Sequence, residues 1–230
     1  MTTFQRARSD EQREVRRRAI LDTAAAMLTE MPVAQLSLNE LARRVGLAKS
    51  NVLRYFESRE AVLLELLDVA FAEWLDLLAL DLPDAVIAGA PAAERIEQTA
   101  AAIADSLTTR PVLCDLISAQ AAVLERNVSP AVAAQYKHAA VGHAQRFARL
   151  VASVIPELSD GAALQFAAAA MMTTGAVWAH SQPSAAMLAA YAAEPELAAL
   201  RLDFSTSLPD LLAVVLSGLL ARPGSPRPAC

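Results

Sequence analysis

The sequence predicts an all-α protein, and its composition and its spacing of apolar residues both support that fold class. Hydrophobic residues make up 55% of the 230 residues, much of that share is alanine, and only 5% are aromatic. Alanine has the highest helix propensity, whereas strands prefer β-branched and aromatic side chains. Apolar residues also recur at steps of three and four, without the alternation that strands show. We therefore expect helices along the whole chain.

The first helix is expected over about residues 11–30. Val15, Ile20 and Leu28 are among the apolar residues that share one face of it, and Pro32 ends it. The preceding residues, 1–10, are expected to form a disordered arm.

Two short helices are expected next, one starting at Ser37 and one from Lys49 to Phe56. Ser37 and Glu40 have the spacing of a capping box, in which the serine hydroxyl accepts from the glutamate N–H and the glutamate side chain reaches back. Gly46 stands where the first of the two helices must stop in a left-handed conformation.

Longer helices are expected over the rest of the chain. Serine, proline and glycine residues mark their ends, and a loop is expected at residues 83–91. The predicted helices cover about residues 58–80, 91–109, 112–126, 130–155, 160–180, a shorter stretch from 183, and 208–220. The organisation predicted is a three-helix domain over 11–57, a larger helical domain over 58–221 and a disordered tail over 222–230.

Charge is distributed unevenly along the chain. Residues 1–60 carry a net charge of +3 and residues 61–230 a net charge of -8, which together give -5. A mildly basic N-terminal head (residues 1–60) followed by an acidic body (residues 61–230) is expected if only the head binds phosphate groups.

The two cysteines give neither a disulfide framework nor a Cys-x-x-Cys pair, and the N-terminus has no apolar signal region, so we expect a cytoplasmic protein.

The two short helices joined by a glycine turn match a helix-turn-helix arrangement, whose second helix enters the major groove of DNA. Lysine and arginine suit phosphate or guanine edges, asparagine suits adenine, and hydroxyls suit phosphate oxygens. The alternative is a surface helix pair with solvated charges. The predicted DNA-binding residues are Ser37, Lys49, Ser50, Asn51, Arg54, Tyr55 and Arg59.

Two questions about this head stay open at the level of sequence. The ring of Tyr55 could pack in the core while its hydroxyl reaches phosphate, or the whole side chain could be core. Arg13, Arg16, Arg17 and Arg18 either run along the DNA backbone or only solvate the first helix.

Residues 37–63, SLNELARRVGLAKSNVLRYFESREAVL, resemble the TetR family of bacterial regulators. The shared pattern consists of Ser37, Ala42 with Gly46, Tyr55-Phe56, and Arg59-Glu60. Leu53 departs from it, because the family commonly has an aromatic residue there, so we assign Leu53 no DNA role and expect apolar packing. Ala48 also replaces a frequent serine, which removes one helix cap.

The resemblance implies a ligand-responsive repressor that binds a palindromic operator on double-stranded DNA as a dimer. It implies a homodimer through the helices at 160–180 and 208–220, and release by a small, largely apolar effector. Bulky apolar residues with a few polar groups could line the effector site, although most of them could equally be ordinary core. The candidates are Phe71, Trp74, Tyr136, His143, Phe147, Met171, Thr174 and Trp178.

Three other classes of protein are possible alternatives to a regulator. No Asp, Glu, Lys or Arg occurs from Gly161 to Ala193, which suggests a membrane segment, but alanine supplies little transfer energy and polar residues interrupt the run. An enzyme is not expected, because the chain has no phosphate loop and no nucleophile elbow. No metal or cofactor is expected either. A helical adaptor without a DNA role stays as the alternative function.

Overall fold

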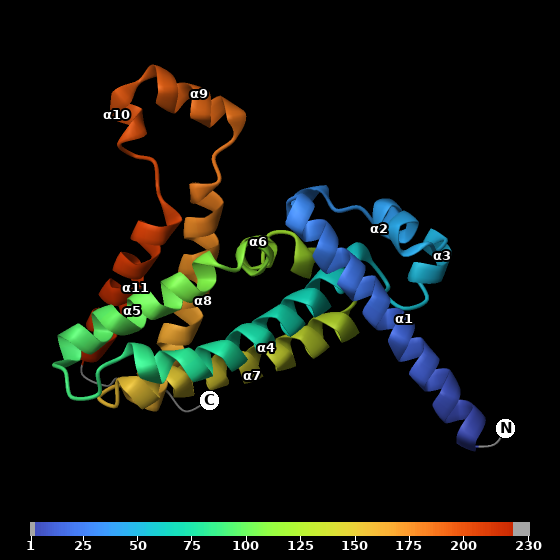
Figure 1. Ribbon diagram of the computed structural model, residues 1–230, viewed down its shortest axis with the longest axis horizontal. Coiled ribbons are helices and arrows are strands. Elements are labelled where there is room, and N and C mark those ends of the chain that lie inside the picture. The colour runs from blue at the N-terminus through green and yellow to red at the C-terminus, as the bar shows by residue number, and fades with distance from the viewer. Residues whose placement is uncertain (1–2, 223–230) are drawn as a thin grey trace. The chain divides into compact units, whose positions relative to one another are not determined.

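The computed structural model describes residues 3–222, and all regular secondary structure within that range is helical, as predicted (Figure 1). The chain forms two compact units, and each is considered by itself. The first unit, here the head unit, holds the residues up to Val69 together with Ala119–Lys137. The second, the body unit, holds Ala70–Ser118 and the residues from His138 onward.

Helix α1 (Thr3–Glu30) begins well before the predicted Glu11, so residues 3–10 are helical where a disordered arm was expected. No proline or glycine occurs in this stretch to stop the helix. Ile20, Ala24 and Met27 are fully buried on one face. Val15, predicted on that face, is instead 65% exposed.

The short helices of the head follow a 3₁₀ turn, η1 (Val33–Gln35). Helix α2 (Leu38–Val45) starts at Ser37, as predicted, and stops at Gly46, whose φ of +73° lies in the left-handed region. Helix α3 (Lys49–Val52) is shorter than the predicted segment to Phe56. Beyond Val52 the chain tightens into i→i+3 hydrogen bonds, from the Arg54 N–H to the Asn51 carbonyl (3.2 Å) and from the Tyr55 N–H to the Val52 carbonyl (2.9 Å).

Helix α4 (Arg59–Ala85) runs past its predicted end at Leu80 and contains Pro83, which was expected in a loop. Its apolar stripe explains the extension, because Leu78, Leu82 and, just beyond the helix, Val86 are all buried. The Ser58 hydroxyl accepts a hydrogen bond from the Ala61 N–H (3.1 Å) at the start of this helix.

The next helices are α5 (Ala92–Thr108), α6 (Pro111–Ala119) and α7 (Pro130–Val154). Helix α6 stops short of the predicted residue 126, at the boundary between the two units. A turn and a 3₁₀ segment, η2 (Leu124–Arg126), follow it in the head unit.

The body unit is completed by α8 (Asp160–Ser181), α9 (Ala185–Ala193), α10 (Pro195–Ala198) and α11 (Phe204–Ala221). Helix α11 lies against α5 and α8 (Figure 1). It starts before the predicted residue 208, because the Asp203 carboxylate caps it by accepting from the Thr206 N–H (3.0 Å). The expected disordered tail, apart from Arg222, lies outside the described residues.

Within the described range, α8 and α11 are the helices long and apolar enough to cross a membrane by length and composition alone. Core helices of water-soluble proteins pass the same test. Here α8 buries Phe166 and Thr174, and α11 buries Leu208, Leu212 and Leu216 in the body unit.

A close approach between α8 and α6 depends on the absence of a side chain at Gly175. A Cβ built there would lie 3.3 Å from the Ser118 Cα and 3.4 Å from the Ile117 side chain. We expect Gly175→Leu to lower the free energy of unfolding by about 1–3 kcal/mol through overpacking, measured by urea denaturation.

Gly142 on α7 provides the matched control, because a Cβ there meets nothing within 4 Å. Gly142→Leu is expected to be neutral or slightly stabilising, since glycine costs about 1 kcal/mol relative to alanine inside a helix. Equal destabilisation by both substitutions would contradict a packing role for Gly175.

Candidate DNA-binding interface

The exposed side chains of the second short helix gather on one face. Ser50 and Asn51 are exposed and lie four and three residues before the exposed Arg54, which follows α3 in the next turn of the chain, so the three side chains lie on one side of the segment. Val52 and Phe56 point the other way, and their side chains are buried (0% and 3% exposed). The apolar half of this helix therefore anchors it while the polar half faces outward.

Leu53 belongs to the exposed face and not to the core. It is 41% exposed, so the apolar packing expected from the sequence is not observed. An exposed leucine between Asn51 and Arg54 provides an apolar contact among polar ones. Sequence reasoning missed it because it judged the position by its family counterpart, and helical spacing from Ser50 would have found it.

Lys49 is exposed and Tyr55 is partly buried at the two ends of this face. The Tyr55 carbonyl accepts a hydrogen bond from Arg17 (2.8 Å). Ala48, the N-cap residue of α3, makes no side-chain cap, as the sequence predicts. The structure thus brings Lys49, Ser50, Asn51, Arg54 and Tyr55 together along one short segment.

The two other predicted contacts have structural partners inside the head. The Ser37 hydroxyl accepts from the Glu40 N–H (3.2 Å) and caps α2. The Arg59 guanidinium donates to the Val33 carbonyl (2.7 Å) and lies 3.8 Å from the Glu60 carboxylate. Arg59 therefore ties the start of α4 to η1, and a phosphate contact by it stays a prediction.

Arg17 joins three segments of the head. Its Nε donates to Glu65 on α4 (2.8 Å), and its Nη2 pairs with the other oxygen of the same carboxylate. Its Nη1 donates to the Tyr55 carbonyl. The guanidinium also lies over the Phe56 ring, 4.3 Å from its centroid. Arg17 therefore neither lies free for the DNA backbone nor only solvates α1. Arg13, Arg16 and Arg18 are exposed, so both alternatives stay open for them.

The role of Arg17 was missed at the level of sequence, although a signal existed. Position 17 is three residues before Ile20 and seven before Ala24, so it lies on the buried stripe of α1. A charged residue on an apolar stripe needs a partner. That requirement marks Arg17 as different from its neighbours.

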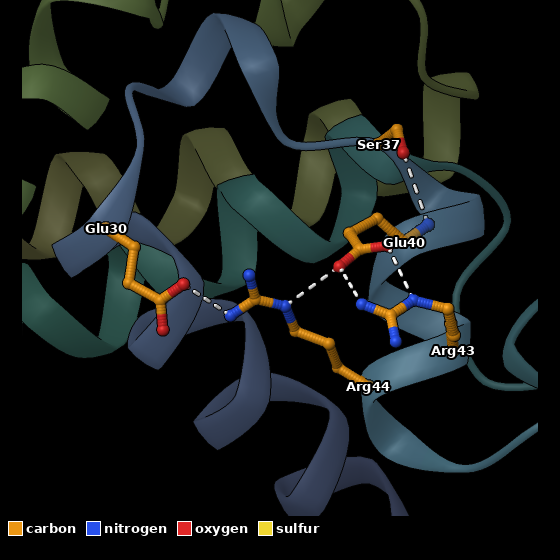
Figure 2. A network of polar contacts seen from close by, with 5 residues as sticks. All are labelled: Glu30, Ser37, Glu40, Arg43 and Arg44. Atoms are coloured by element: carbon orange, nitrogen blue, oxygen red, sulfur yellow. Dashed lines mark hydrogen bonds and ion pairs between the residues drawn. The ribbon is translucent and has the colours of Figure 1, made fainter.

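A second ion-pair network holds α2 to the end of α1 (Figure 2). The Glu40 carboxylate accepts from Arg43 (2.6 and 2.8 Å) and from Arg44 (3.0 Å), and Arg44 also pairs with Glu30 (2.7 Å). Hydrogen bonds from Arg43 and Arg44 lower the pKa of Glu40 to about 2. Only the Ser37 half of the predicted capping box is therefore formed as expected, since the Glu40 side chain turns to these arginines.

Four of the candidate effector-site residues form a chain of rings in the body unit. Phe71 stacks on His143 (5.2 Å between centroids) and meets Trp74 edge-on (5.1 Å), and Trp74 meets Phe147 (5.1 Å). This row of rings continues from Phe147 to Phe166 (5.9 Å between centroids). It runs from partly exposed rings at Phe71 to fully buried ones, as an apolar binding region or a plain core would.

The other candidates are not part of that chain. Trp178 meets Phe204 (5.1 Å), and the buried Thr174 hydroxyl donates to the Ala170 carbonyl (2.8 Å). Met171 is partly buried on α8. Tyr136 belongs to the head unit, where burial raises the pKa of its hydroxyl.

A hollow of about 340 Å³ lies elsewhere in the body unit, on the surface between α7 and α8. Its walls include Gln145, Arg149, Asp160 and Leu164. None of the predicted effector-site residues lines it, so it does not support their assignment.

Comparison with known proteins places the two parts of the chain in one family. The family model for bacterial regulatory proteins, tetR family, matches residues 20–66. A second model, the tetracyclin repressor-like C-terminal domain, matches residues 68–223. The HTH-type transcriptional regulator EthR of Mycobacterium tuberculosis is 46% identical over 50 residues, which is 22% of this chain and 23% of EthR. The match therefore spans about a quarter of that relative's length.

Solved structures share the fold over nearly the whole chain. A TetR transcriptional regulator from Rhodococcus sp. RHA1 superposes with a TM-score of 0.55 at 14% identity, covering 92% of this chain and 96% of that one. FadR, a fatty acid degradation regulator from Bacillus halodurans, gives 0.51 at 15% identity (87% and 98%). FadR from Bacillus subtilis, in complex with stearoyl-CoA, gives 0.51 at 17% identity (85% and 96%).

The Arg17 to Glu65 pair should couple strongly in a double-mutant cycle. We expect Arg17→Gln to lower the free energy of unfolding by about 1.5–3 kcal/mol, because it removes a charge-assisted pair and leaves the Tyr55 carbonyl without its donor. Glu65→Gln should act similarly, and the double variant should cost at least about 1 kcal/mol less than the two single changes added together. The exposed Arg18→Gln serves as control and should change stability by less than about 0.5 kcal/mol. Additive effects would contradict the proposed contact.

Glu40→Gln should reduce thermal stability at neutral pH but not in strong acid. The folded-state pKa of Glu40 is lowered from 4.5 to about 2, so its contribution is complete above the higher value and is lost as pH falls through the lower one. We expect the variant's lower melting temperature to converge on that of the unmodified protein across this interval. Calorimetry between pH 7 and pH 2 measures it, with exposed Glu14→Gln as control. A gap that stays constant with pH would count against the network in Figure 2.

Proposed function

Because the chain belongs to the TetR family of bacterial DNA-binding transcription regulators, we propose that it is a ligand-responsive repressor. It occupies a palindromic operator in the cytoplasm as a homodimer, and a small, largely apolar effector releases it. The observation that carries the proposal is the exposed face of α3, with its polar residues held outward by buried Val52 and Phe56.

The side chains of that face match the chemistry of a major groove. Asn51 is suited to pair with an adenine edge and Arg54 with guanine or phosphate. Leu53 adds an apolar surface for a thymine methyl group. Lys49, Ser50 and the Tyr55 hydroxyl are suited to phosphate oxygens, which position the protein without reading sequence.

The proposed dimer uses the exposed faces of α8 and α11. Met172 on α8 is 70% exposed, and Leu211 and Val214 on α11 are 42% and 68% exposed. Apolar side chains with that exposure mark a surface whose burial against a partner lowers the free energy. A two-fold dimer through these helices would present two recognition helices to successive major grooves, about 34–36 Å apart.

The effector is proposed to be apolar because the ring chain from Phe71 to Phe166 offers few polar groups. FadR from Bacillus subtilis, which shares the fold, was solved in complex with stearoyl-CoA, and this complex is consistent with a largely apolar effector. Release follows only if the effector binds a DNA-incompetent conformation more tightly than the competent one.

Titration of the protein with DNA flanking its own gene tests the proposal and assigns two residues. We expect Lys49→Ala to weaken binding to specific and random DNA alike, and to reduce the slope of log affinity against log salt by about 1. Asn51→Ala should cost about 1–3 kcal/mol on the specific site only, because it removes base readout and not a charge. Fluorescence anisotropy at several salt concentrations measures both effects.

Exposed Glu14→Gln, on α1, provides a control for effects of the substitution itself. Binding that is absent or independent of salt would favour a helical adaptor without a DNA role. Equal losses on all sequences from both alanine variants would refute the two assigned roles while leaving DNA binding intact.

A further inference from the structure

The segment that joins α8 to α11, residues 182–203, is here called the apolar hairpin, and α9 and α10 follow one another along it (Figure 1). Helix α9 has the sequence AAMLAAYAA, and no residue of α9 or α10 is buried. Met187 and Leu188 are 46% and 44% exposed, and Leu200 and Leu202 are 71% and 38% exposed. In the picture the hairpin extends beyond the ends of α8 and α11.

Within its own subunit the hairpin is stabilised mainly by the Ser184 cap of α9, whose hydroxyl accepts from the Met187 N–H (3.3 Å), and by contacts between α9 and α10. Isolated helices shorter than about 12–15 residues are marginal in water, and most helices are stabilised by packing an apolar face. Helix α9 has 9 residues and α10 has 4. Ala190, Tyr191 and Leu197 are half-buried and the other apolar side chains of the two helices are exposed, so contacts within the subunit cover only part of their apolar surface.

We propose that the apolar hairpin packs on the partner subunit of the homodimer. The inference rests on the dimer of the proposed function and adds a second contact region to it. The hairpin of each protomer reaches past its own α8 and α11 and covers the other protomer, so that two equivalent arms flank the two-fold axis.

Exposed apolar side chains on the two helices that carry the hairpin favour a second copy as the occupant. The hairpin is joined directly to α8 and α11. Met172 on α8 is 70% exposed and Val214 on α11 is 68% exposed. No Asp, Glu, Lys or Arg occurs from Gly161 to Ala193, so α9 and the part of α8 after Asp160 carry no such charge. A two-fold interface is made of the same patch on both subunits, and an apolar patch is complementary to itself.

The charges of the hairpin argue against a lipid surface. Its second half carries Glu194, Glu196 and Asp203 against the single Arg201. Anionic lipids attract clusters of lysine and arginine and repel net negative segments. An anionic membrane is therefore the less favoured occupant, and the experiment includes vesicles as an outcome.

The test compares two double variants of the full-length chain. Met187→Asp with Leu188→Asp places charges on the hairpin, and Leu80→Asp with Ile87→Asp places the same charges on other apolar residues of the body unit, which are 70% and 60% exposed. Sedimentation equilibrium should show at least a tenfold higher dimer dissociation constant for the hairpin variant and less than a twofold change for the control. Circular dichroism checks that both variants fold.

Hydrogen exchange on the unmodified protein gives a second measurement that needs no substitution. Amides of α9 should exchange at least tenfold more slowly at concentrations well above the dimer dissociation constant than well below it. A dimer with unchanged dissociation constant in the hairpin variant and with unprotected α9 amides would overturn the hairpin contact but leave the dimer standing. A protein that is monomeric at all concentrations would overturn both, and binding of the monomer to neutral or anionic vesicles that the hairpin variant loses would assign the hairpin to lipid.

Discussion

The arrangement of the head depends on the guanidinium of Arg17. It reaches from α1 to the Glu65 carboxylate on α4, to the Tyr55 carbonyl after α3, and over the Phe56 ring. Helix α3 has only four residues, too few to hold a position by its own hydrogen bonds. One planar group with five donors therefore fixes the position of α3 relative to α1 and α4.

Polar residues act mainly at helix ends, while apolar stripes decide how far helices run. Ser37, Ser58, Ser159 and Asp203 each accept a hydrogen bond from a backbone N–H at the start of a helix. These caps fix where a helix begins, and buried leucines extend helices through positions where proline alone would suggest a break.

The sequence predicted the helical class, the capped starts at Ser37, Ser58 and Ser159, and most of the exposed recognition segment, because these depend on local chemistry. Ser37 and Gly46 are read from their neighbours alone. It did not predict contacts between distant residues: the pairing of Arg17 with Glu65, the ties of Arg59 to Val33, and the continuation of α4 past Pro83 all depend on what packs against them. Leu53 was misjudged for a related reason, since its exposure depends on which way a short helix is rotated by Val52 and Phe56.

The apolar hairpin also has a consequence for how the sequence can change over time. Because none of the residues of α9 and α10 is fully buried within the subunit, most substitutions there should cost the fold little stability. Their main effect falls on the proposed contact of the hairpin with the partner subunit. In a cell that holds several regulators of one fold, such a segment is where copies can diverge until they no longer pair with one another, at little cost to the rest of the molecule.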